Sequence, residues 1–304
     1  MSSYFYVNPD RYGRFGHQTL RILTGLLYYQ LTAIPILSPR YLYFCEKWNQ
    51  YIDWNILDFC VSAASFTNIL NLGLTFDSVG NRKYPFDSGA ELFHLTEYLL
   101  RQDKTLIQFP FDQHPGILLR LLKKSDIRTQ FQQVFQPFKS IRPFAKPYIA
   151  FHIRRGDCTA SSHPQWYITD EIYNSLISYL LAEVPRRIPM IICTQGATHG
   201  LSSDIINDEI SSGRLLISST DQLFINDAEV EAFSFMLNSA FLFCSGSSFS
   251  QLAAVFGSPK ISFDISRFPA FPGIDFTLSP DDLDPAQIAH RIFRKLNTLS
   301  TNSG

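Results

Sequence analysis

Two adjacent arginines are the residues of this chain whose chemistry is easiest to interpret. Arg154 and Arg155 lie in the segment FHIRRGD, residues 151–157, at the end of an apolar run that is typical of a β-strand. Open α/β sheets bind ligands at the carboxyl ends of their strands, and a guanidinium can hold a phosphate through two hydrogen bonds. We therefore expect one or both arginines to bind phosphate, with His152 on the same side of the strand as Arg154. Asp157 would orient an arginine or present a carboxylate to the cleft, and the alternative is a surface arginine pair beside an acid.

A second candidate anion site lies in the segment CSGSSFS, residues 244–250. Small hydroxyl residues and a glycine here separate an apolar strand from the start of a helix, where backbone N–H groups and the helix dipole attract anions. Ordinary N-capping by serine would also explain the pattern, and the missing GK[ST] ending argues against an ATP-binding P-loop. Two anion-binding loops at neighbouring strand ends favour a ligand that contains a diphosphate.

A third segment, YGRFGHQ at residues 12–18, has the composition of a ligand-binding loop. Gly13 and Gly16 predict a turn that lets the backbone approach a ligand closely before a helix begins. His17, at the expected helix start, is a candidate base, a hydrogen-bond donor or a simple capping residue. The sequence contains neither HExxH nor GxSxG, so we expect no metal site and assign the stabilisation of a leaving diphosphate to the arginines.

The elements that carry these motifs follow one another in the order of an α/β protein. The first forty residues predict a strand at 4–7, a helix with leucines at helical spacing from Leu20 to Leu31, and a strand at 34–37. Residues 40–140 predict helices at 91–101 and 115–124 but no sheet. The segment 137–147 contains three prolines and predicts an interdomain linker.

Beyond this linker, predicted strands and helices alternate regularly. Strands are predicted at residues 148–153, 190–194, 215–218, 241–244 and 260–263, and helices at 169–184 (with Thr169 as N-cap), 201–212, 228–238, 249–256 and after Pro285. Such alternation is typical of a parallel sheet covered on both faces. We therefore predict an α/β protein of two domains, residues 1–145 and 146–304, that face a cleft.

Composition limits the partners and the compartment. Hydrophobic residues at 45% and charged residues at 17% indicate a folded protein, and a net charge of −1 argues against a nucleic-acid partner. Five cysteines without a CxxC pair favour a reducing compartment, and Cys193 and Cys244 are typical of buried small side chains. The N-terminus lacks a signal-peptide pattern, and the most apolar stretch, residues 22–37, is shorter than the roughly 18 residues of a membrane helix. We expect a cytoplasmic protein with no transmembrane segment.

Three segments of the chain resemble one family of enzymes. HIRRGD at residues 152–157 is similar to the HxRRxD motif of the GDP-fucose-dependent fucosyltransferases, the superfamily of α1,2-, α1,6- and protein O-fucosyltransferases. GRFGHQ at residues 13–18 is similar to their N-terminal GRxGNQ loop. The run from Asp227 through FLFCSGSSFSQLAA to Ala254 resembles their last motif, in which an acidic, methionine-containing helix precedes a strand and a serine-rich loop. The three segments follow the family order.

The resemblance implies a GT-B-like fold of two Rossmann-like domains, with the acceptor bound largely by the N-terminal one and the donor nucleotide by the C-terminal one. It implies an inverting, metal-independent transfer of fucose from GDP-fucose to a glycan hydroxyl, without a cofactor. Arg155 would act in catalysis, and Asp157 or His17 would be the general base. The donor-binding residues would be Gly16, His152, Arg154, Arg155, Thr194, Asp227, Gly246, Ser247, Ser248 and Phe249, with the arginines on the β-phosphate and Ser247–Phe249 near the diphosphate.

Two positions depart from the family pattern. His17 stands where the family usually has Asn, and Gln195 stands where it often has Asp. Donor or acceptor choice would then differ from that of typical members. The alternatives are a glycosyltransferase that uses another nucleotide sugar, and a catalytically inactive protein of the same fold that binds carbohydrate or nucleotide. The membrane anchor of the eukaryotic Golgi enzymes is lacking, which suits a soluble bacterial or viral enzyme.

Overall fold

The chain folds into two compact units, Met1–Pro137 and Phe138–Gly304. The computed structural model describes residues 4–6, 15–37, 39, 43–57, 60–61, 67–71, 75–76, 82–83, 97–98, 101, 104–108, 125–195, 201, 203–220, 227–257, 259, 261–267 and 273–301. The predicted helix at 115–124 lies outside these residues, and so does the one at 91–101 except for residues 97, 98 and 101.

The first unit is built on a parallel sheet of five short strands in the order β3-β2-β1-β7-β4. Residues 40–140, for which the sequence predicted no sheet, supply β3, β4 and β7. The elements are β1 (Tyr4–Tyr6), α1 (Phe15–Thr32), β2 (Ile36–Leu37), β3 (Cys60–Val61), β4 (Asn68–Asn71), the antiparallel pair β5 (Thr75–Phe76) and β6 (Arg82–Lys83), β7 (Thr105–Gln108) and α4 (Ser125–Val134), with 3₁₀ helices at Tyr43–Gln50, Trp54–Ile56 and Gln136–Ser140.

The second unit is a doubly wound α/β fold. Its six parallel strands have the order β10-β9-β8-β11-β12-β13, which is the 3-2-1-4-5-6 order of dinucleotide-binding domains. The strand order therefore reverses between β8 and β11. The elements are β8 (Ile149–Ile153), α5 (Asp170–Glu183), β9 (Met190–Gln195), α6 (Asp204–Ser211), β10 (Leu215–Thr220), α7 (Asp227–Leu237), β11 (Phe241–Cys244), α8 (Ser248–Gly257), β12 (Ile261–Ile265), β13 (Phe276–Leu278), a 3₁₀ helix at Pro280–Asp282, and α9 (Pro285–Thr301).

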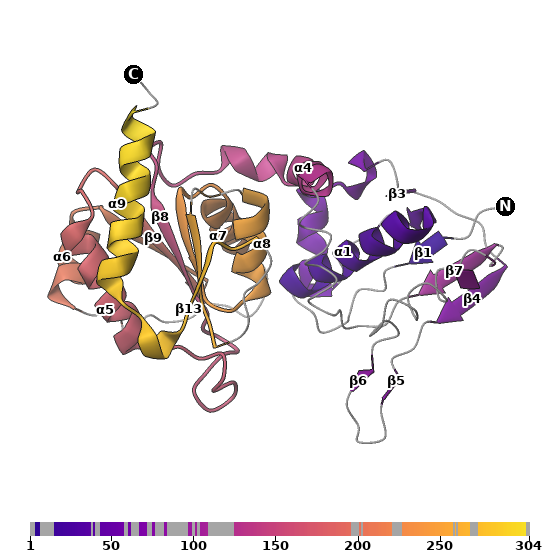
Figure 1. Cartoon of the computed structure of the whole chain (residues 1–304), viewed down its shortest axis with the longest axis horizontal. Coiled ribbons are helices and arrows are strands. Elements are labelled where there is room, and N and C mark those ends of the chain that lie inside the picture. Colours follow the sequence, from indigo (N-terminus) through magenta and orange to yellow (C-terminus); the bar gives the residue numbers. More distant parts are fainter. Residues whose placement is uncertain are drawn as a thin grey trace. The chain divides into compact units, whose positions relative to one another are not determined.

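The two faces of this sheet differ in chemistry, because side chains alternate along each strand. Alternate residues of β8, such as Phe151, join an apolar core with β9 to β12 and with α5, α6 and α9, the helices on one side of the sheet in Figure 1. Phe151, Phe243 and Phe263 stack across neighbouring strands at 4.6 and 4.7 Å between ring centroids. The opposite face carries smaller and more polar residues, among them His152 and Asp264, beneath α7 and α8.

The segment predicted to be a linker is partly folded onto the second unit. Phe138 is buried and packs edge-on against Phe233, with 5.6 Å between ring centroids. The amide of Asn238 donates to the carbonyls of Phe138 and Ile141 at 2.8 and 3.0 Å. The contacts divide the chain before Phe138, whereas the proline pattern predicted the boundary after residue 145.

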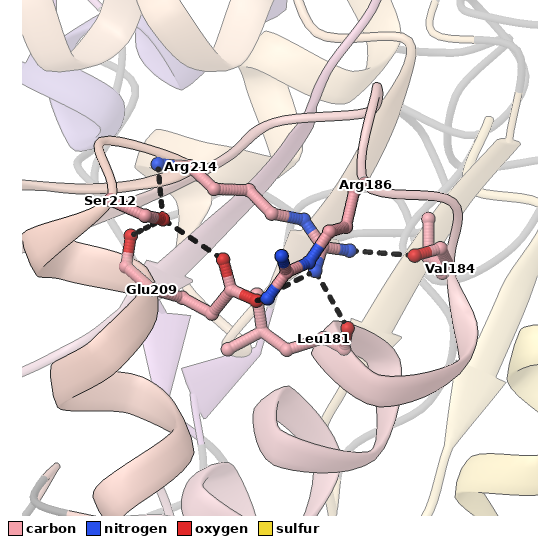
Figure 2. Close-up of polar contacts among 6 residues, drawn as sticks. All are labelled: Leu181, Val184, Arg186, Glu209, Ser212 and Arg214. Carbon is pink, nitrogen blue, oxygen red and sulfur yellow. Dashed lines mark hydrogen bonds and ion pairs between the residues drawn. The ribbon is translucent and has the colours of Figure 1, made fainter.

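A buried ion pair joins elements at the amino ends of the strands (Figure 2). Arg214, which precedes β10, bonds to Glu209 of α6 at 3.1 Å and donates to the carbonyls of Leu181 and Val184 at the end of α5. Burial alone would raise the pKa of Glu209, but the Ser212 hydroxyl and the Arg214 guanidinium together hold that pKa below its ordinary value. The pair fastens α5, α6 and β10 to one another, away from the carboxyl ends of the strands.

Most of the predicted elements of the second unit are confirmed, with ends shifted by a few residues. Thr169 occupies the N-cap position of α5, although its side chain makes no capping hydrogen bond. The sequence reading missed β13, an edge strand of three residues. Among the described cysteines, Cys193 and Cys244 are buried as predicted, and both are free thiols. None of the described helices is long and apolar enough to cross a membrane.

Candidate functional site

The candidate site lies at the carboxyl ends of β8 and β11, where the strand order reverses. In doubly wound sheets this reversal opens a crevice, because the loops that follow the two strands run to opposite faces of the sheet. Residues 154–157, which we call the arginine loop, follow β8, and residues 245–247, the serine loop, follow β11. The structure therefore brings together, within the second unit, the two loops that the sequence predicted to bind anions.

His152, in β8 just before the arginine loop, holds the serine loop and α8 against the strand. Its Nδ1 lies 3.0 Å from the hydroxyl oxygens of both Ser245 and Ser250. The Ser250 hydroxyl donates to the carbonyl of Ser247 at 3.2 Å, so it can accept a hydrogen bond from Nδ1–H of His152. Burial and, secondly, the charge of Arg154 lower the pKa of His152 to about 3. The imidazole is therefore neutral at physiological pH.

Arg154 keeps part of its side chain accessible to solvent. One of its terminal nitrogens lies 3.3 Å from a carboxylate oxygen of Asp157, and its guanidinium carbon lies 5.2 Å from the ring centroid of Trp166. The side chain is 24% exposed. Asp157 and Trp166 hold the guanidinium, while part of the side chain stays exposed.

Arg155 makes structural contacts within the second unit. Its guanidinium pairs with Asp170, the first residue of α5, and donates to the carbonyls of Arg154 and Ile168 at 2.9 and 3.0 Å. The rings of Tyr167 and Tyr173 lie 4.6 and 5.6 Å from the guanidinium carbon. Only 12% of the side chain is exposed. The two arginines therefore occupy different environments, although they are adjacent in the chain.

The chain beyond the arginine loop is held close to it by polar contacts. The carbonyl of Asp157 accepts hydrogen bonds from Nδ1 of His163 at 3.0 Å and from the Ser162 hydroxyl at 2.9 Å. His163 stacks on Trp166, with 5.1 Å between ring centroids. Gly156, between the arginines and Asp157, has φ +75°, a conformation that favours glycine. These contacts fix the position from which Arg154 faces the crevice.

The serine loop is fixed from below by a buried carboxylate. Asp264 of β12 accepts a hydrogen bond from the backbone N–H of Gly246 at 2.9 Å and another from the side-chain amide of Gln251 at 2.8 Å. Gly246 has φ +62°, and a Cβ there would lie 3.1 Å from the hydroxyl oxygen of Ser266. α8 begins at Ser248, so its first N–H groups, which have no carbonyl partner within the helix, follow the loop.

The other predicted site residues are placed only in part. Thr194 is buried in β9, in register with Ile153 at the end of β8. Asp227 is the first residue of α7, and its side chain lies outside what is described, as does that of His17. Gly16 is the second residue of α1, so the prediction of a turn at Gly16 is wrong. Since α1 begins at Phe15, His17 lies in its first turn.

Sequence reasoning missed two acids and two aromatic residues near the site: Asp170, Asp264, Trp166 and Tyr167. One signal was available for Asp264, since an acid inside the apolar run ISFDI must be buried with its charge compensated. No sequence signal distinguished Arg155 from Arg154. Among the described residues no group of His, Cys, Asp or Glu side chains gathers in a way that could hold a metal ion.

No protein-family model and no curated protein matches the sequence. Among solved structures, POFUT1 in complex with GDP-fucose matches 86% of this chain and 98% of its own, with a TM-score of 0.53 and 13% identity. Another crystal form of that complex matches 91% of this chain and 98% of its own, with a TM-score of 0.50 and 10% identity. E. coli heptosyltransferase WaaC with ADP-2-deoxy-2-fluoro heptose covers 96% of this chain and 99% of its own, at a TM-score of 0.49 and 11% identity. At 10–13% identity the two POFUT1 matches show a common fold. The chain thus has the GT-B-like α/β fold, with a Rossmann-like parallel sheet in each unit.

Proposed function

We propose that this protein is a glycosyltransferase that moves fucose from GDP-fucose to a hydroxyl of a glycan, with inversion at the anomeric carbon. One observation carries the proposal. Arg154 and the start of α8 lie at the carboxyl ends of β8 and β11, at the reversal of strand order, and His152 of β8 contacts Ser245 of the serine loop and Ser250 of α8. This is the place where a doubly wound sheet binds the diphosphate of a nucleotide. POFUT1, of similar fold, was solved with GDP-fucose.

The chemistry that these residues would supply is charge stabilisation. When the bond between the anomeric carbon and the β-phosphate oxygen breaks, negative charge develops on the departing GDP. The Arg154 guanidinium and the first N–H groups of α8 would accept that charge in fixed positions, at no cost of reorganisation. Arg154 takes the phosphate role here because its side chain is the more exposed of the pair. Arg155 would act indirectly, by holding the arginine loop in position through its bonds to Asp170 and to the carbonyl of Arg154.

Other residues of the two loops and of neighbouring elements would complete the binding site for the sugar donor. His152 would bond to the donor through Nε2, which takes part in none of the hydrogen bonds found among the described residues. Gly246, Ser247, Ser248 and Phe249 would contact the diphosphate, and Thr194, Asp227 and Gly16 would lie near the donor, as the resemblance implies. Asp157 and His17 are the candidate general bases for the acceptor hydroxyl. The variants His17→Asn and Asp157→Asn separate them, because only loss of the general base should abolish turnover while GDP affinity is preserved.

A thermal-shift comparison of nucleotides tests the donor class. GDP and GDP-fucose should raise the unfolding midpoint more than UDP or ADP at equal concentration, because a ligand that binds only the native state stabilises it by mass action. The shift should persist in EDTA. A preference for UDP or ADP would overturn the GDP-sugar assignment, and binding of GDP-fucose without turnover on any glycan acceptor would overturn the enzymatic one.

A further inference from the structure

A carboxylate is buried directly beneath the proposed diphosphate site. Asp264 is the fourth residue of β12 and has no exposed surface. In the sheet it stands in register with Cys244, the last residue of β11, from which the serine loop departs. The side chain therefore lies under that loop, on the face of the sheet that α8 covers.

The two oxygens of this carboxylate bind the serine loop and the helix that follows it. Oδ1 accepts from the backbone N–H of Gly246 at 2.9 Å, and Oδ2 accepts from Nε2 of Gln251, in the first turn of α8, at 2.8 Å. Gly246 is in the left-handed region, which favours glycine, and a Cβ there would lie close to the hydroxyl oxygen of Ser266, at 3.1 Å. A single side chain thus sets the backbone of the loop and the position of the helix that follows it.

Burying this carboxylate is costly, so its retention needs a reason. Burial raises the pKa of Asp264, and among the described residues no lysine or arginine pairs with it. Its other neighbours, Cys244 and Tyr173, are uncharged side chains whose own pKa values burial raises. Among the described residues, two hydrogen bonds compensate Asp264 for its lost hydration, one from the serine loop and one from α8.

We propose that Asp264 is a positioning residue that holds the serine loop so that the first N–H groups of α8 face a diphosphate. The inference rests on the proposed function, because that function supplies the diphosphate. Without the carboxylate, the N–H of Gly246 and the amide of Gln251 lose their acceptor. The serine loop can then adopt another conformation, in which the N-terminus of α8 no longer faces the diphosphate. Asp264 touches no reacting atom.

Calorimetric binding of GDP, GMP and pyrophosphate to Asp264→Ala and Asp264→Asn tests the proposal. Asp264→Ala should weaken GDP binding about 10- to 100-fold, because the first backbone N–H groups of α8 would no longer point at the diphosphate. GMP, which has no diphosphate, should lose less affinity. Asp264→Asn should recover most of the affinity, because its oxygen can accept from Gly246 and its amide can donate to a flipped Gln251 side chain.

Asp275→Ala is the matched control. Asp275 also accepts from a backbone N–H of β12, that of Ser262 at 2.7 Å, but at the opposite end of the strand. This variant should lower the unfolding midpoint while leaving GDP affinity unchanged. If Asp264→Ala does not fold, Gln251→Ala, which removes one of the two bonds, should still weaken GDP more than GMP.

The outcomes separate the two proposals. Wild-type protein that binds GDP while Asp264→Ala or Gln251→Ala binds it equally well overturns the positioning role alone. An equal loss for Asp264→Ala and Asp264→Asn, or for GDP and GMP, also overturns it. Wild-type protein that binds pyrophosphate but not GDP overturns the GDP-sugar assignment, and the same variants then test Asp264 with pyrophosphate. Wild-type protein that binds neither overturns both.

Discussion

Arg155 is paired with Asp170, the first residue of α5, and so belongs to the framework of the fold. Its neighbour Arg154 pairs only at 3.3 Å with Asp157 and is twice as exposed, at 24% against 12%. Successive side chains at the end of a strand point to opposite faces of the sheet. The adjacent arginines therefore differ in environment, and only Arg155 is held by α5.

We expect the alanine variants of the two arginines to differ in kind. Arg154→Ala should lower kcat/KM by roughly 30- to 1000-fold, the effect of about 2–4 kcal/mol of lost charge stabilisation, with little change in stability. Arg155→Ala should lower the free energy of unfolding by about 2–4 kcal/mol, because Asp170 and two tyrosine rings lose their partner. Urea unfolding and steady-state kinetics measure both. A stable Arg155→Ala protein that cannot bind GDP would return the phosphate role to Arg155.

A side chain at Gly156 should be unfavourable for two reasons that can be separated, the backbone conformation and the space that Gln195 occupies. The φ of Gly156 is +75°, and a Cβ would lie 2.7 Å from the side-chain oxygen of Gln195. Gly213 has the same φ with nothing within 4 Å of its Cβ position, so Gly213→Ala carries the backbone strain alone. We expect both alanine variants to lose about 1–2 kcal/mol of stability from that strain. Only Gly156→Ala should also lose GDP affinity, because its methyl group would meet Gln195 and displace the arginine loop.

Removing the obstructing side chain provides the control for this prediction. Gln195→Ala in the Gly156→Ala background should restore much of the GDP affinity, because the added methyl group then has room. Affinity that stays lost in the double variant would show that Gln195 is not the obstacle.

Stability should fall with acid because of His152. Its pKa in the folded protein is lowered to about 3, against about 6.5 in the unfolded chain. Between these values the unfolded chain binds the proton that the folded protein excludes, so the stability is fully present above pH 6.5 and declines below it. From pH 7 to pH 5 this group should cost about 2 kcal/mol of unfolding free energy. His152→Gln should remove that part of the decline, and an identical pH dependence in both proteins would contradict the prediction.

The buried pair in Figure 2 should matter to stability and not to binding. Arg214→Ala should cost about 3–5 kcal/mol of unfolding free energy, because Glu209 loses its buried cation and the end of α5 loses two donors. Arg186→Ala is the control, since Arg186 contacts the same carboxylate but is 86% exposed and should cost at most about 1 kcal/mol. Chemical denaturation measures both. A lowered Glu209 pKa predicts that this stabilisation is lost as the pH falls below about 4.3.

Local pattern determined most of the second unit. Apolar runs of four to six residues, alternating with segments of helical periodicity, predicted β8 to β12 and the helices between them. A parallel sheet that is buried on both faces produces this pattern in the sequence. The arginine loop and the serine loop were found because each follows such a run. The first unit shows a weaker sequence pattern, because its strands have only two to four residues.

Tertiary structure alone decided which residues meet. The sequence could not separate Arg154 from Arg155, because the difference lies in Asp170 and Tyr173, which reach Arg155 only once α5 has packed on the sheet. Nor could it connect Asp264 with Gly246, since that hydrogen bond requires β12 to lie beside β11 in register. Periodicity records whether a residue is buried, but strand order and register fix its partners, and those follow from packing of the whole unit.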